Sequence, residues 1–195
     1  MIENISTPDT NQVNIYLDKW DSLENYVLQE ESLNKLFFET YPHNEEISEI
    51  LVKASTLNDF YSTNIFSIFP IAKHILQLHI DERLNLADPT LVNDIALLIY
   101  EDGKTRNYYS FATKYCSHHR PLDYPIYDSY VEKVLFYFKK QDKFSNFSRQ
   151  DLRDYTRFKN VIQEFRSFYG LDQYNLKDID RYLWQLGKDY FPNRY

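Results

Sequence analysis

Lys114 and Asp128 have the side chains and the sequence surroundings best suited to chemistry in this protein. At about 100° per residue on a helical wheel, Lys114 shares a polar stripe with Asn107, Ser110 and His118, beside an apolar face. Partial desolvation at the edge of a packed face favours the neutral, nucleophilic form of an amine. Asp128 follows the proline-containing segment RPLDYPIY and is predicted to start a helix, where free backbone N–H groups stabilise a carboxylate. The residues between Lys114 and Asp128 are numerous enough to let Asp128 fold back beside Lys114, although the sequence does not require it.

The elements that must position this pair are predicted to be helices. Apolar side chains recur at spacings of three and four residues along most of the chain, as expected of buried helix faces. The clearest stripe comprises Tyr108, Phe111, Ala112, Tyr115 and Cys116. Four helices are predicted before this stripe. Apolar stripes at 17–28 and 47–54 predict the first two, and a third is predicted near Pro70. The fourth begins at Asp88-Pro89, contains Ile99 and ends near Gly103.

Three more helices are predicted after the proline-containing segment. The first begins near Asp128 or Ser129, and Ser129 with Glu132 has the pattern of a capping box. The second carries apolar side chains at helical spacing over residues 152–165 and ends at Gly170. The last contains IDRYLWQLGKDYF and is predicted to end near Gly187.

The charge is unevenly distributed over the predicted fold. We predict a flexible N-terminus at 1–12 and a single all-α domain at 13–195, either undivided or with two lobes that meet near Gly103. The net charge is −7, but the first 102 residues hold 18 Asp+Glu and 5 Lys+Arg, whereas the rest hold 11 and 17. The domain therefore has an acidic half, 13–102, and a basic half, 103–195. The basic half leaves a polyanion such as DNA open as a partner.

The segment SFATKYCSHHRPLDYPIYDSYVEKVL resembles the catalytic segment of the helix–hairpin–helix DNA glycosylases. It is most similar to the divergent bacterial proteins with an 8-oxoguanine DNA glycosylase fold. Lys114 matches the lysine of that family, and Pro125-Ile126-Tyr127-Asp128 matches its proline-to-aspartate segment with one extra residue. The resemblance implies that Lys114 attacks the sugar C1′ and forms a Schiff base, while Asp128 activates the lysine or stabilises the cationic sugar. The glycine-rich hairpin of that family has no counterpart in RNYYSFATKY.

The resemblance also implies a double-stranded DNA partner with one flipped nucleotide. Basic side chains in and around the predicted catalytic helix are the candidate phosphate contacts: Lys104, Arg106, His118, His119 and Arg120. Helix capping is an equally good interpretation of the two histidines. Candidates for stacking on the flipped base are Tyr109, Tyr124 and Tyr127, for which ordinary packing is the alternative.

Several classes of protein are excluded or disfavoured by what the sequence lacks. It contains no apolar run long enough to cross a membrane and no signal-peptide pattern at its start, so we expect a cytoplasmic protein without membrane contacts. The single cysteine, Cys116, excludes an internal disulfide framework and is expected in the core. No metal-binding or nucleotide-binding motif is present, so we expect neither a metal site nor a cofactor.

Three functions remain open from the sequence. The first is a base-excision DNA N-glycosylase, with or without AP-lyase activity. The second is a non-catalytic nucleic-acid-binding module of the same fold, and the third is a helical protein-interaction domain. Each fits the helical pattern, and the first depends on Lys114 and Asp128.

Overall fold

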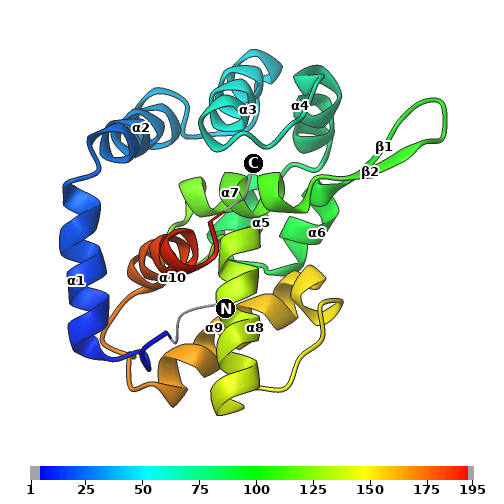
Figure 1. Ribbon diagram of the computed structural model, residues 1–195. Helices are drawn as coiled ribbons and strands as arrows, with labels where there is room; N and C mark the ends of the chain where they lie inside the picture. The colour runs from blue at the N-terminus through cyan, green and yellow to red at the C-terminus, as the bar shows by residue number, and fades with distance from the viewer. Residues whose placement is uncertain (1–4, 193–195) are drawn as a thin grey trace. The chain divides into compact units, whose positions relative to one another are not determined.

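The structure is a computed structural model that describes residues 5–192. Within this range the chain forms ten α-helices and one two-stranded sheet (Figure 1), so the prediction of a mostly helical fold is confirmed and a small sheet is added to it. The chain divides into two compact units, Asn25–Ile126 and the segments that precede and follow it. The divisions therefore lie after residues 24 and 126, and not near Gly103.

The unit Asn25–Ile126 contains the helix that carries Lys114. That helix, α7 (Tyr109–His119), packs against α3 and α6, and every residue from Phe111 to His119 is buried. The other elements of this unit are α2 (Glu24–Asn34), a π-helical segment (Lys35–Thr40), α3 (Ile47–Tyr61), α4 (Ile68–Gln77), α5 (Asp81–Asn85), α6 (Thr90–Ala96), β1 (Leu97–Ile99) and β2 (Thr105–Asn107). Cys116 lies in this core, as predicted, and burial raises the pKa of its thiol.

A β-hairpin replaces the end of one predicted helix. Helix α6 ends at Ala96, and β1 pairs with β2 in antiparallel register, with Leu98 opposite Arg106. Gly103 adopts φ +79° in the connecting turn, a conformation that favours glycine, so it closes a hairpin rather than a helix. Ile99, expected on a buried helix face, is 65% exposed. Figure 1 shows the hairpin extending away from the helices of its unit.

The other unit combines α1 (Thr10–Asp21) with the C-terminal part of the chain. Its further elements are α8 (Ser129–Asp142), a 3₁₀ turn (Asp151–Arg153), α9 (Tyr155–Phe168) and α10 (Leu176–Tyr190), and α10 packs against both α1 and α8. Gly170, at φ +66°, follows the end of α9 as predicted. Gly187 instead lies inside α10, where an added Cβ would come within 2.6 Å of the Tyr130 Cβ. The predicted helix end near Gly187 is therefore wrong, because this glycine permits the close approach of α8.

The beginning of the chain differs from the prediction in two ways. Residues 5–12, expected to be flexible, include the start of α1 and the buried Ile5, whose N–H donates to the Tyr137 hydroxyl at 2.9 Å. Residues 1–4 lie outside the described part of the chain. The stripe predicted at 17–28 is interrupted between α1 and α2, and the buried side chains of these helices are Val13, Tyr16 and Leu33 instead.

The acidic and basic halves of the sequence do not correspond to the two units. The unit Asn25–Ile126 holds 8 Lys+Arg and 14 Asp+Glu, a net charge of −6, and the rest of the chain has a net charge of −1. Lys114 thus belongs to the more acidic unit. Among the described residues, no helix is both long enough and apolar enough to cross a bilayer.

Candidate functional site

The Lys114 side chain lies in a small polar cluster on α7. It is 3% exposed, and its amine donates to the Ser110 hydroxyl at 2.6 Å. The same amine lies 3.4 Å from the Ser110 carbonyl oxygen and 5.3 Å from the centroid of the Tyr61 ring. Ser110 and Tyr61 are both half-buried. The amine therefore contacts a hydroxyl and a carbonyl oxygen of α7 and the face of an aromatic ring of α3.

His118 extends the same cluster by one helical turn. Its Nε2 lies 2.9 Å from the Tyr61 hydroxyl, and its ring centroid lies 5.6 Å from that of Tyr61. The predicted polar stripe is thus confirmed for Ser110, Lys114 and His118, whereas Asn107 lies in β2 and is exposed. We call Tyr61, Ser110, Lys114 and His118 the Lys114 cluster.

Asp128 is the N-cap of α8, as predicted. Its carboxylate accepts hydrogen bonds from two backbone N–H groups of the first turn, at 2.8 and 2.9 Å. The Ser129–Glu132 capping box does not form, because Asp128 occupies the capping position and Glu132 pairs with Arg149 at 2.9 Å. Asp128 belongs to the unit that does not contain Lys114, so an encounter between the two side chains remains a prediction.

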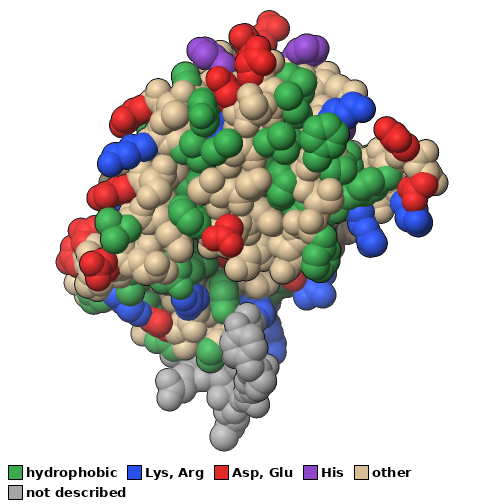
Figure 2. Space-filling model, turned by 90° about the horizontal axis from the view of Figure 1, so that it is seen from above, with side chains coloured by type: hydrophobic (Ala, Val, Ile, Leu, Met, Phe, Trp, Pro, Cys, Tyr) green, Lys and Arg blue, Asp and Glu red, His purple; other side chains and the backbone are tan. Residues whose placement is uncertain are grey.

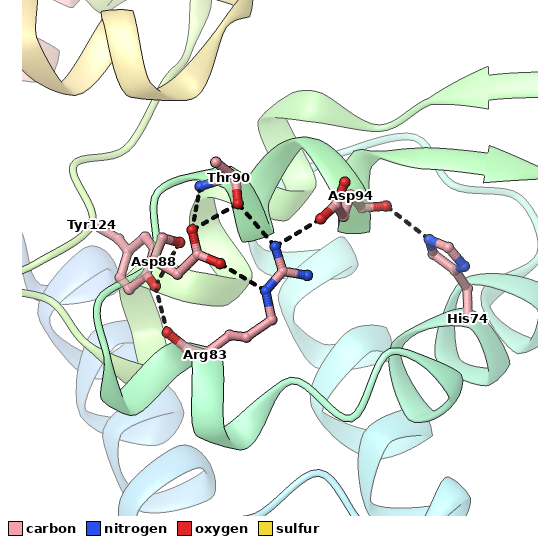
Figure 3. Close-up of polar contacts among 6 residues, drawn as sticks. All are labelled: His74, Arg83, Asp88, Thr90, Asp94 and Tyr124. Atoms are coloured by element: carbon pink, nitrogen blue, oxygen red, sulfur yellow. Dashed lines mark hydrogen bonds and ion pairs between the residues drawn. The ribbon is translucent and has the colours of Figure 1, made fainter.

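A polar brace anchors the segment that leaves α7 toward Asp128. In Figure 3 the Tyr124 hydroxyl points to the backbone oxygens of Asp88 and Arg83, at 3.0 and 3.3 Å. The Arg83 guanidinium in turn binds the Asp88 and Asp94 carboxylates, each at 2.7 Å. Burial raises the pKa of the Tyr124 phenol, which stays a neutral donor. We call Arg83, Asp88, Asp94 and Tyr124 the brace. It connects residues 120–126 to α5 and to the start of α6.

The candidate phosphate contacts divide into exposed and buried positions. Lys104 and Arg106 are exposed on the hairpin and Arg120 is half-buried; Lys104 pairs with Asp102 and Arg120 with Asp123. His118 and His119 are 3% and 8% exposed. Both histidines bond to side chains inside their own unit, so neither ring is placed as a surface phosphate contact.

The three candidate stacking tyrosines are buried. Tyr109, Tyr124 and Tyr127 are 2%, 0% and 3% exposed. Tyr124 belongs to the brace, and Tyr127 donates to Glu132 and packs edge-on against Phe158. The alternative of ordinary packing is therefore the one that the structure favours for them.

A second polar group, fully inside the unit Asn25–Ile126, was not predicted. Lys53 is completely buried and donates to the backbone oxygens of Tyr41 and His43, at 3.0 and 2.6 Å, and to Asn44 Oδ1 at 2.8 Å. Burial lowers the pKa of Lys53 to about 8 against the opposing effect of Asp81, so the ammonium persists at neutral pH. A sequence signal existed, because Lys53 falls on the apolar stripe of α3.

Asn44 connects this lysine to the C-terminal end of α7. The Asn44 Oδ1 also accepts from the Tyr115 hydroxyl at 2.6 Å, and its Nδ2 donates to Asp81 at 2.5 Å and lies 3.2 Å from His119 Nε2. We call Asn44, Lys53, Asp81, Tyr115 and His119 the Asn44 network. Burial, and then the charge of Lys53, holds the pKa of His119 well below its ordinary value. The network fixes the end of α7.

Lowering the pH is expected to destabilise the protein through His119. Below pH 6.5 the unfolded chain binds a proton at this position that the folded state excludes, which lowers the free energy of unfolding by about 1.4 kcal/mol per pH unit. Urea denaturation at pH 7, 6 and 5 measures this slope. His119→Gln keeps an acceptor for Asn44 and should reduce the dependence of the free energy of unfolding on pH. His79→Asn changes an exposed histidine and should leave this dependence unchanged. An equally steep slope in His119→Gln would contradict the assignment.

Comparisons with known proteins place the Lys114 cluster in a family domain. Residues 12–123 match a family model described as HI_0787_N, N-terminal domain. An uncharacterized protein of Haemophilus influenzae is 50% identical to this chain over 147 residues, which are 75% of this chain and 70% of that protein. No solved structure matches. The matched residues include the whole Lys114 cluster and end before Asp128.

Proposed function

The chain belongs to the HI_0787_N family, and we propose that it is a DNA base-excision glycosylase with Lys114 as its nucleophile. The observation that carries this proposal is the environment of the amine, which is buried against the Ser110 hydroxyl and the Tyr61 ring. A lysine desolvated by burial can act as the nucleophile that forms a Schiff base. The resemblance of residues 110–135 to the catalytic segment of helix–hairpin–helix glycosylases supports the same role.

The proposed reaction takes place on a flipped nucleotide. The neutral Lys114 nitrogen forms a bond to C1′ while the bond between C1′ and the base breaks, and the base leaves with that electron pair and is protonated. The attached nitrogen loses one proton, and the C1′–O4′ bond then breaks as O4′ takes up a proton. The product is a protonated Schiff base, which water hydrolyses and borohydride reduces to a stable secondary amine.

Asp128 is the proposed partner of the lysine. Its carboxylate is held at the start of α8 by two backbone N–H groups, which suits a fixed negative charge that accepts the proton or stabilises a cationic sugar. Lys104, Arg106 and Arg120 remain the proposed phosphate contacts. The buried His118 and His119 are no longer among them.

Borohydride trapping tests the proposal directly. Duplexes that carry a panel of damaged bases or an abasic site are incubated with the protein and borohydride, and covalent adducts are separated by denaturing electrophoresis. We expect an adduct with the wild type and none with Lys114→Gln. Lys73→Gln, an exposed lysine of α4 in the same unit, is the matched control and should trap like the wild type. The absence of both adduct and base release across the panel would refute the glycosylase.

A protein-interaction function is the second candidate, and one surface favours it. Phe66, Phe69, Leu97 and Ile99 are 102%, 57%, 48% and 65% exposed. Figure 2 shows hydrophobic side chains gathered over α3, α4 and the base of the hairpin. Exposed apolar groups in such a patch often mark a binding surface. If the protein does not bind DNA even at low salt, the protein-interaction function is favoured. If it binds DNA in a salt-dependent manner but catalyses no reaction, the non-catalytic nucleic-acid-binding module is favoured.

A further inference from the structure

Building on the proposed function, we propose that Ser110, Tyr61 and His118 are positioning residues that hold the Lys114 amine in one orientation for attack. None of the three needs to touch the substrate in this role. They act through Lys114, from two separate helices of one unit. The contacts that give them this role lie within the unit Asn25–Ile126.

Ser110 determines where the lysine chain ends. It precedes Lys114 by one helical turn, and side chains on a helix extend toward the N-terminal turn. The amine therefore reaches both polar oxygens of Ser110, with Oγ at 2.6 Å and the carbonyl oxygen at 3.4 Å. Two acceptors on one residue confine the end of a side chain that has four rotatable bonds.

Tyr61 confines the amine from the other helix. It is the last residue of α3, and its ring centroid lies 5.3 Å from the Lys114 nitrogen. The ring itself is fixed, because its hydroxyl is bonded to His118 Nε2 at 2.9 Å. His118 also packs against Phe37, with ring centroids 5.5 Å apart. The tyrosine thus connects α3 to the same stripe of α7 that carries the lysine.

A fixed amine has a direct consequence for rate. Attack on C1′ requires the nitrogen to approach at reacting distance along one direction, and a displacement of about 1 Å can cost on the order of 100-fold. A lysine free to rotate would spend most of its time elsewhere. The cluster therefore supplies orientation, while Lys114 supplies the bond-forming electron pair.

Two measurements test this role, one with DNA and one without. The first is the single-turnover rate of borohydride trapping at saturating duplex. The second is reductive methylation by formaldehyde and cyanoborohydride without DNA, quantified at each lysine by mass spectrometry. Circular dichroism and thermal melting establish that each variant is folded at the assay temperature.

We expect Ser110→Ala and Tyr61→Leu each to slow trapping by about 10- to 100-fold. In both variants methylation of Lys114 should increase severalfold, because the released amine becomes mobile, while methylation of Lys73 stays constant. Ser110→Thr keeps the hydroxyl and should restore trapping. The matched controls are Ser55→Ala and Tyr41→Phe, which lie outside the cluster and should behave like the wild type.

The link between Tyr61 and His118 has its own test. Tyr61→Phe and His118→Leu each remove the 2.9 Å contact, so the double variant should lose no more trapping than either single variant. Additive losses would overturn this link.

The two arms separate this inference from the proposed function. If the wild type neither forms an adduct with any duplex nor releases a base, the glycosylase proposal fails, and methylation still decides whether the amine is held. If Ser110→Ala and Tyr61→Leu match the wild type in both trapping and methylation of Lys114, the positioning role is refuted.

Discussion

Asn44→Ala is expected to lower the free energy of unfolding by about 3–5 kcal/mol. The Asn44 side chain is 2% exposed and is the centre of the Asn44 network. Its removal takes one acceptor from the Lys53 ammonium, the acceptor of Tyr115, and a donor from Asp81. A buried charge that loses a partner keeps its desolvation penalty, which is why the loss exceeds that of an ordinary hydrogen bond.

Urea denaturation at pH 7, followed by circular dichroism, measures this loss. Asn34→Ala is the matched control, because Asn34 is exposed at the end of α2 and its side chain makes no capping hydrogen bond. Its effect should stay within about 0.5 kcal/mol. A loss below about 1 kcal/mol for Asn44→Ala would mean that water or a rearranged side chain satisfies the network.

Gly187→Leu is expected to destabilise the protein by about 3 kcal/mol, through the contact between α8 and α10. A Cβ at this position would lie 2.6 Å from the Tyr130 Cβ and 2.9 Å from the Tyr130 carbonyl oxygen. The second of these atoms is backbone, so the two helices have to separate to admit any side chain. Gly187→Ala should cost less, because alanine regains about 1 kcal/mol of helix propensity.

Thermal and urea denaturation of the two Gly187 variants form a size series. Gln163→Leu places the same side chain on an exposed position of α9 and serves as the control. We expect the order of stability to be wild type, then alanine, then leucine, with the control close to wild type. Equal stability of all four proteins would refute the close approach of the two helices.

The parts of the fold that depend on local signals could be predicted from the sequence. The stripe that includes Phe111, Ala112 and Tyr115 forms the buried face of α7, and Asp128 caps α8, because helical spacing and capping act within one or two turns. The polar stripe with Ser110, Lys114 and His118 follows from the same geometry.

Other parts depend on tertiary packing and could not be predicted. The sequence does not say which of its 18 tyrosines are exposed, and the three proposed for stacking lie in the cores. The hairpin at Leu97–Ile99 and Thr105–Asn107 was missed because Ile99 also fits the helical spacing of α6. The burial of His119 required the loop that carries Asn44, which is 75 residues away in the sequence.

The distribution of charge between the two units could not be predicted from the sequence either. Division of the sequence near its middle separates an acidic half from a basic one, but the chain crosses between units at residues 24 and 126. The unit with Lys114 has a net charge of −6, so electrostatic attraction of that unit as a whole does not bring DNA to it. Any DNA footprint on this unit has to be local, around Lys104, Arg106 and Arg120.

The discontinuous unit has a consequence for the order of events during synthesis. Helix α1 packs against α10, and the Tyr16 hydroxyl bonds to Asp189 across 173 residues of sequence. Helix α1 must therefore leave the ribosome long before its partner exists. The unit Asn25–Ile126 is complete in the meantime and can fold first, since domains generally fold as units while the chain is made. The Lys114 cluster can thus assemble during synthesis while Val13 and Tyr16 of α1 still lack the helix that covers them.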